Sequence, residues 1–149
     1  MMTETMPQSG FYAKVRQGMP ALIDQWRRLG RGDADRLALI LAETARVARL
    51  GEPEATPDGA TLAAWSQPGA GDGIPLWAAR TATFLLVQMP ARPVPASDEE
   101  ACAWAYCWLL NRDFASVEAA RAALPEHLHE RLDHAVGAAW ADRQGLRLV

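Results

Sequence analysis

Arg80 is the residue of this chain whose neighbours most favour binding of a charged group. If the segment is helical, Trp77, Phe84 and Val87 lie on the same side as Arg80, at positions i−3, i+4 and i+7. A guanidinium on such an apolar, aromatic side costs free energy unless it is paired. It could therefore anchor the carboxylate or phosphate of a ligand, or an acidic side chain of a partner. Alternatively, it pairs with an acidic residue of the C-terminal half or extends its stem to water.

A second candidate surface combines an aromatic residue with the only concentration of basic residues in the sequence. Trp26 precedes Arg27 and Arg28, and Arg31 and Arg36 follow closely. An aromatic residue beside basic groups is typical of a contact surface for another protein. Two helices around a turn also resemble a helix-turn-helix in outline, so this patch could bind nucleic acid. Interleaved aspartates and the net charge of −3 oppose phosphate binding.

A third candidate lies in a stretch rich in helix breakers, over residues 51–73. Eight glycines and prolines in this stretch predict a long surface connection. Residues 61–65 could form one helical turn within it, and Trp65 would pin the connection to the body of the protein. Loops of this length are uncommon without a function, which makes Trp65 a candidate contact residue. The alternative is an apolar tether on an ordinary insertion.

No pattern of nucleophilic or metal-binding residues predicts catalysis. Cys102 and Cys107 lie in one apolar run, where a thiol stays protonated. Their separation of five residues points them to different sides of a helix, so no disulfide can join them. The three histidines, at positions 127, 129 and 134, belong to a polar side expected to face water. We therefore predict no catalytic residue, no metal site and no cofactor.

The elements that must position the candidate residues surround one apolar run, Ala101–Leu110, which carries no charge. Ser97 and Glu100 precede it with the spacing of a capping box. In this motif the serine hydroxyl accepts from the glutamate N–H, and the glutamate accepts from the serine N–H. Because the run is apolar all round, we expect its helix in the middle of the molecule, with Trp104 and Trp108 in the core.

Composition indicates the fold class. The chain of 149 residues has 29 alanines and 17 leucines but only 10 isoleucines and valines together, which favours helix. We predict a disordered tail over residues 1–9 and one all-α domain over residues 10–149, an irregular bundle of about six helices. Besides a short helix at 11–17, the expected helices lie at 20–29, 36–50, 75–89, 98–112, 115–124 and 125–143, with 98–112 packed by 36–50, 75–89 and 125–143.

Composition and charge also bear on origin and compartment. Fourteen arginines against one lysine, together with the excess of alanine, are typical of a GC-rich bacterial genome. The first ten residues do not resemble a secretory signal, and the apolar stretches are shorter than the ~20 residues of a membrane span. We therefore expect a cytoplasmic protein. Residues 11–50 hold eight basic and four acidic side chains (net +4), whereas residues 51–149 hold seven and thirteen (net −6).

These features lead to three hypotheses about function. The favoured one is a small non-enzymatic bacterial protein that acts by binding another protein, as an adaptor, chaperone or toxin-immunity protein. This hypothesis is based on the lack of a catalytic or metal-binding pattern, on the six tryptophans and on the opposite net charges of residues 11–50 and 51–149. The alternative is a small-molecule-binding or catalytic protein with a pocket of Arg80, Trp77 and Phe84, with Trp104 opposite. The second alternative is the nucleic-acid binder. A homo-oligomer is compatible with each hypothesis, and no membrane partner is expected.

Overall fold

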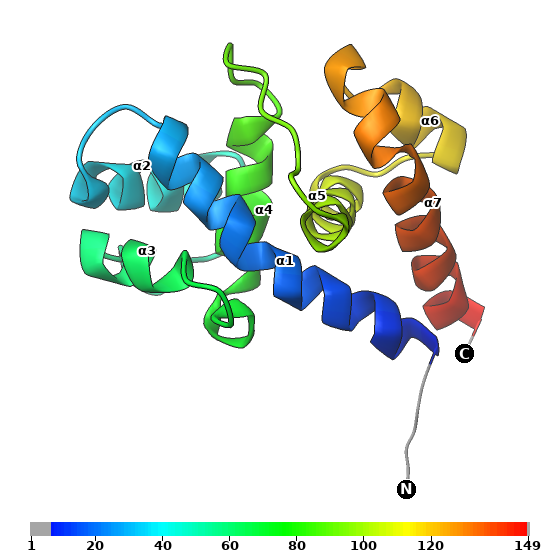
Figure 1. Cartoon of the computed structure of the whole chain (residues 1–149), viewed down its shortest axis with the longest axis horizontal. Coiled ribbons are helices and arrows are strands. Elements are labelled where there is room, and N and C mark those ends of the chain that lie inside the picture. The colour runs from blue at the N-terminus through cyan, green and yellow to red at the C-terminus, as the bar shows by residue number, and fades with distance from the viewer. Residues whose placement is uncertain (1–6, 149) are drawn as a thin grey trace, which may run out of the picture.

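Helix α1 (Pro7–Leu29) crosses the molecule and contacts helices at both of its ends (Figure 1). The computed structural model describes residues 7–148, with side chains described for residues 10–144. Over these residues the chain forms seven α-helices, one short 3-10 helix and no strand, which confirms the predicted all-α class. The tail expected over residues 1–9 falls mainly outside the described residues. The other α-helices are α2 (Ala34–Val47), α3 (Gly59–Trp65), α4 (Leu76–Leu86), α5 (Asp98–Asn111), α6 (Val117–Ala122) and α7 (Glu126–Leu148).

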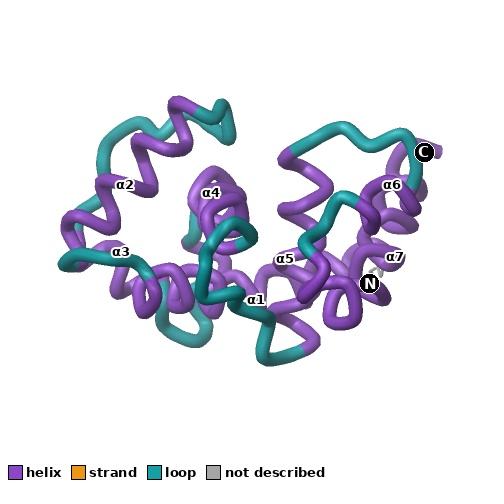
Figure 2. Tube along the Cα trace, turned by 90° about the horizontal axis from the view of Figure 1, so that it is seen from above, coloured by secondary structure: helices purple, strands orange, loops and turns teal. Residues whose placement is uncertain are grey.

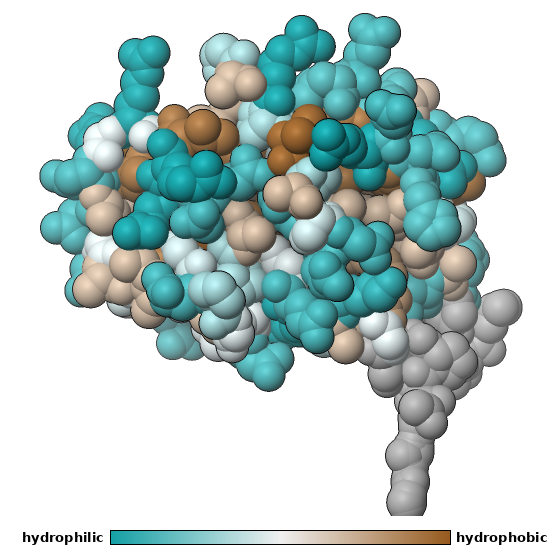
Figure 3. All heavy atoms as spheres, viewed as in Figure 1, coloured by the Kyte–Doolittle hydropathy of each residue, from teal (hydrophilic) through white to brown (hydrophobic). Residues whose placement is uncertain are grey.

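The helices lie in two groups along α1. Figure 2 shows α2 and α3 at one end, α6 and α7 at the other, and α4 and α5 between them. α1 and α5 are the central pair, and their contact is the most extensive between any two helices described. On the face seen in Figure 3 hydrophilic side chains cover most of the surface. Apolar atoms are visible there in several places, among them one near the C-terminal end of α1 and one beside the loop between α4 and α5.

The prediction of two separate helices before residue 30 is wrong, because α1 continues through Gly18 and Pro20. Gly18 is buried where α1 meets the start of α5, and a Cβ at this position would overlap the carbonyl oxygen of Glu99. This glycine therefore permits a close contact between two helices and does not end one. Pro20 removes the N–H that would bond the carbonyl of Arg16, four residues earlier. Packing of α1 along the molecule offsets that loss.

Helix α5 is the buried central helix that its apolar run predicts. Trp104 and Cys107 are fully buried, and Trp108 is 7 % exposed. Ser97 caps the helix by accepting a hydrogen bond from the N–H of Glu100 at 3.1 Å. Its neighbours are α1, α7 and α4. The expectation that the helix at 36–50 packs on α5 is wrong, because α2 packs on α3 and α4, and α4 lies between α2 and α5.

The side chain of Glu100 does not complete the predicted capping box but is buried, with 2 % exposure. One carboxylate oxygen accepts from Gln25 Nε2 at 2.6 Å and from Trp104 Nε1 at 3.1 Å, and the other accepts from the N–H of Ala96 at 2.9 Å. These three donors compensate for burial of the carboxylate. They also join α1, α5 and the proline-rich segment before α5.

The remaining elements begin largely where local signals predict. Asp33 caps α2 by accepting from the N–H of Arg36 at 2.9 Å, and Pro75 directly precedes α4. The connection over residues 51–73 is more structured than one turn, because it contains α3 and a 3-10 helix (Gly71–Gly73). That connection forms one side of the site described next.

Candidate functional site

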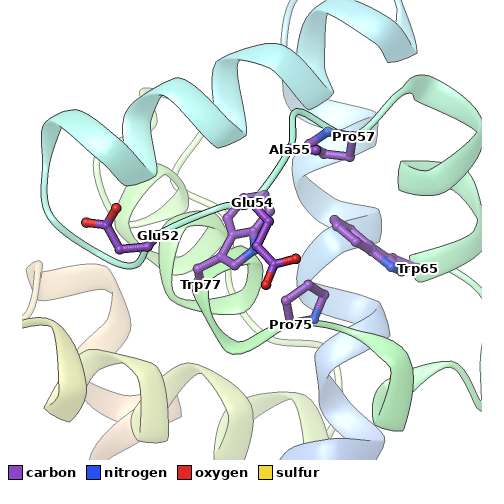
Figure 4. Close-up of a pocket in the computed structure, with 7 residues that line it drawn as sticks. All are labelled: Glu52, Glu54, Ala55, Pro57, Trp65, Pro75 and Trp77. Atoms are coloured by element: carbon purple, nitrogen blue, oxygen red, sulfur yellow. The ribbon is translucent and has the colours of Figure 1, made fainter.

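A concave site with aromatic walls lies between the 51–73 connection and the start of α4 (Figure 4). It encloses about 440 Å³, within the usual range for ligand pockets. We call it the tryptophan cleft and define it by the residues that line it: Glu52, Glu54, Ala55, Pro57, Trp65, Pro75 and Trp77.

Trp65 lies at the C-terminal end of α3, which is held in place at its N-terminus. The Asp58 carboxylate accepts from the N–H of Thr61 at 2.8 Å, and this hydrogen bond lowers the pKa of Asp58. The N–H of Gly59 donates to Asp35 of α2 at 2.6 Å. The short helix is thus tied to α2, and the position of Trp65 is fixed with it.

Trp77 lies in the first turn of α4 and forms the second wall. The connection passes directly over it at Gly51, where a Cβ would overlap the Cβ of Trp77 and where φ is +153°. Both constraints favour glycine at this position. The two indole rings are 6.0 Å apart between centroids, with an angle of 80° between their planes. Trp65 therefore pins the connection to the body of the protein as expected, and Trp77 is the residue it contacts.

The chain between the two tryptophans is anchored on α1. Arg16 donates from Nη1 to the carbonyls of Gly71 at 3.0 Å and of Ile74 at 3.2 Å. Gly71 also approaches the carbonyl of Arg16, the one that lacks an N–H partner because of Pro20, so closely that a Cβ would overlap it. Helix α1 thus holds the base of the connection, and the walls of the cleft are preformed.

Two carboxylates lie at the edge of the cleft. Glu52 and Glu54 are both exposed, and neither has an ion-pair or hydrogen-bond partner among the described residues. In the view of Figure 4 the carboxylate of Glu54 is on the side of Trp77 that faces Trp65 and Pro75, whereas Glu52 points away from Trp65. The cleft therefore combines apolar, aromatic walls with negative charge at its edge.

Arg80 is not part of the tryptophan cleft, although Trp77 is. Its Nε donates to Asn111 Oδ1 at 2.9 Å and its Nη2 donates to the carbonyl of Leu110 at 2.9 Å. Asn111 Nδ2 donates back to the carbonyl of Arg80 at 3.0 Å. The guanidinium thus donates hydrogen bonds to the C-terminal end of α5. Its acceptors are an amide oxygen and a backbone carbonyl, not the acidic side chain that was expected.

Phe84, the third residue of the expected pocket, lines a different cavity. This cavity encloses about 310 Å³, and we call it the Phe84 groove. Arg112 lies at its side, over the rings of Trp108 at 6.0 Å and Phe114 at 5.2 Å. The groove is lined by Ala48, Leu50, Phe84, Val87, Gln88, Trp108, Asn111, Arg112, Ala123 and Pro125. Trp104, expected opposite Arg80, is fully buried and lines neither cavity.

The contact surface expected around Trp26 lacks its aromatic residue, because Trp26 is buried. Trp26 is 5 % exposed, and its indole N–H donates to the carbonyl of Leu37 at 3.2 Å. Arg27 and Arg28 remain at the surface, but both pair with Asp24, at 3.7 and 2.8 Å. Trp26 belongs to the hydrophobic core together with Leu37 of α2, a contact between two helices that the local sequence does not reveal.

The cysteines are held as thiols. Burial raises the pKa of Cys107 to about 12 and also raises the pKa of Cys102. Cys102 lines a small cavity with Lys14, Asp98 and His134, in which Lys14 donates to Asp98 at 3.0 Å. Within the described residues, no group of three or more His, Cys, Asp and Glu side chains is placed to hold a metal ion.

Sequence reasoning missed Glu52, Glu54 and Gly51. The available signal was the alternation of acidic residues and prolines over residues 52–57, which can give an extended segment whose acidic side chains stay in water. What the sequence does not give is the contact of this segment with Trp77, which lies some 25 residues further along the chain.

Comparisons with protein-family models, with curated proteins and with solved structures found no match. In the described part of the chain, no helix is both long and apolar enough to cross a membrane. The fold and the site together define a small all-α protein with an open aromatic cleft edged by carboxylates.

Proposed function

We propose that this protein acts by binding a segment of another protein in the tryptophan cleft. The observation that carries the proposal is the pair of half-buried tryptophans, Trp65 and Trp77, at an open cavity of about 440 Å³. Tryptophan is the side chain most enriched among residues that dominate protein interfaces, because it brings a large apolar area with few rotatable bonds. Adaptor, chaperone and toxin-immunity roles all fall within this proposal.

The chemistry of the lining residues favours binding over catalysis. No histidine, cysteine, serine or lysine is among the residues that line the tryptophan cleft. Its titratable groups are two exposed carboxylates, which lack the buried surroundings that tune a catalytic acid or base. Preformed walls favour affinity, since little conformational freedom is lost when the ligand binds.

The proposal is tested by crosslinking from inside the cleft. A photoreactive phenylalanine analogue at Ala55 should give a discrete covalent adduct with a second protein in the cells that encode this chain. The same analogue at Glu118, on α6, should give none, and Trp65→Leu should abolish the adduct from position 55. An adduct of twice the chain's mass would identify a second copy of the chain as the partner. Equal adducts from positions 55 and 118, or none from either, would refute the proposal.

A second candidate function is binding of a small amphiphilic anion in the Phe84 groove. The observation that favours it is Arg112, whose guanidinium lies beside apolar walls and has no acidic partner among the described residues. Octanoate should then raise the melting temperature of the protein, and Arg112→Gln should remove this effect. An unchanged melting temperature at millimolar octanoate would rule this function out.

A further inference from the structure

We infer that the group held in the tryptophan cleft is a basic side chain, an arginine or lysine, of the partner. This inference rests on the proposed function and specifies the chemistry that the cleft recognises. It is carried by two features together, the geometry of the indole pair and the charge around it.

The indole pair offers the aromatic part of a cation site. A cation within about 6 Å of a ring centroid is attracted by the negative face of the ring, and tryptophan gives the strongest attraction. Trp65 and Trp77 have centroids 6.0 Å apart and planes at 80°, so they form two walls of a corner. A group placed in this corner is within reach of both rings. Pro57 and Pro75 add apolar surface for the methylene stem of a basic side chain.

The charge of the cleft selects a cation over an anion. Glu52 and Glu54 are its only charged lining residues, and no basic side chain lines it. Among the described residues, Asp24, Asp98 and Asp133 are the acidic residues that have a cationic partner. The two glutamates have no such partner among the described side chains, so their charge remains available to a ligand. An anionic group would meet like charge here, which is unfavourable.

Glu54 is the carboxylate placed to contact the ligand. Figure 4 shows it on the side of Trp77 that faces Trp65, whereas Glu52 points to the far side of Trp77. A guanidinium or ammonium in the corner would therefore have aromatic walls and one carboxylate oxygen acceptor near it. Glu52 contributes only through its longer-range field, which salt screens. This difference provides a matched pair of variants on the same segment.

The inference is tested with the full chain labelled with nitrogen-15 and four capped peptides, Gly-Gly-X-Gly-Gly. X is arginine, lysine, citrulline or glutamate, and citrulline keeps the shape of arginine without its charge. The readout is the indole N–H signals of Trp65 and Trp77, assigned with single Trp→Phe variants. We expect the arginine and lysine peptides to shift both signals, and the citrulline and glutamate peptides to bind at least about fivefold more weakly.

Three variants make the test specific for the site. Glu54→Gln should weaken binding of the arginine peptide by about two- to fivefold, as for an exposed ion pair. Glu52→Gln should have less effect, and Glu118→Gln on α6 none. Trp65→Leu keeps an apolar side chain but removes the ring, and should weaken binding about three- to tenfold. Unchanged melting curves of the variants would show that the fold is retained.

Two results would overturn the inference. Citrulline peptide binding as tightly as arginine peptide would show a cleft that accepts side chains without regard to charge, and the proposed function would stand. Arginine and lysine peptides that shift neither indole signal would also overturn the inference. In that case the crosslinking experiment from position 55 decides separately whether a protein occupies the cleft.

Discussion

Replacing Gly18 by alanine sets two effects of opposite sign against each other within α1. Alanine is favoured over glycine in the interior of a helix by about 1 kcal/mol, because glycine loses more backbone freedom on folding. Judged from helix propensity alone, the substitution should stabilise the protein. The structure predicts the reverse, because the added Cβ would overlap the carbonyl oxygen of Glu99 and lie 2.8 Å from the Cα of Glu100.

The size of the effect follows from what the Cβ meets. Both contacts are backbone atoms at the start of α5, so no side chain can rotate away and the helices must separate. Overpacking of this kind costs about 3 kcal/mol at the upper end of its range, and separating the α1–α5 contact also weakens dispersion attraction across it. After subtraction of the gain in helix propensity, we expect Gly18→Ala to lower the free energy of unfolding by about 2 kcal/mol.

Gly10 provides a matched control in the same helix. A Cβ there would meet nothing within 4 Å, so Gly10→Ala should leave stability unchanged or raise it by up to about 1 kcal/mol. Urea denaturation followed by circular dichroism measures both variants, and a loss of 2 kcal/mol corresponds to a melting temperature lower by about 4–8 °C. If Gly18→Ala were as stable as the parent protein, the close contact of α1 with α5 would be refuted.

Two further predictions concern buried groups of the central helix. Glu100→Ala should lower the free energy of unfolding by about 3 kcal/mol or more, because three donors lose their acceptor, and a loss below 1 kcal/mol in urea denaturation would contradict this. Cys107 favours the thiol in the folded state, with its pKa raised from 9.0 to about 12. The contribution of the buried thiol to the free energy of unfolding is therefore fully present below pH 9. It is lost as the pH rises toward 12, by at most about 1.4 kcal/mol per pH unit. The free energy of unfolding, measured by urea denaturation at each pH, should fall less steeply over this window for Cys107→Ala than for the parent protein. Parallel declines of the two proteins would refute the raised pKa of Cys107.

Much of the fold was predictable because its signals are local. Caps such as Asp33 and Ser97 hold the first turns of their own helices, and an apolar run of ten residues has no place but the interior. Gly18 was misinterpreted for the opposite reason. A glycine that ends a helix and one that lets two helices touch look the same in a sequence, and only the position of α5 distinguishes them.

The candidate site was predictable only in part. Trp65 and Trp77 were both selected, but for separate reasons, and their contact depends on how the connection folds back on α4. Arg80 was selected for its apolar surroundings, yet its partners are the amide and carbonyl at the end of α5, more than 30 positions away in the case of Asn111. Trp26 shows the same limit, since the carbonyl that receives its N–H belongs to a different helix. Contacts between residues far apart in the sequence determine the geometry of the site, and the periodicity of apolar residues does not reveal such contacts.

The anchoring of the 51–73 connection on Arg16 has a consequence for the kinetics of binding. Because hydrogen bonds to α1 and α2 hold the walls of the cleft, association of the proposed ligand should not wait for a rearrangement of the loop. The association rate should then be set by diffusion and by the attraction of the glutamates for a cation, and it should fall as salt is added. Variants of the tryptophans would act instead on the lifetime of the complex. A ligand that recognises this surface would therefore arrive quickly and leave at a rate determined by Trp65 and Trp77.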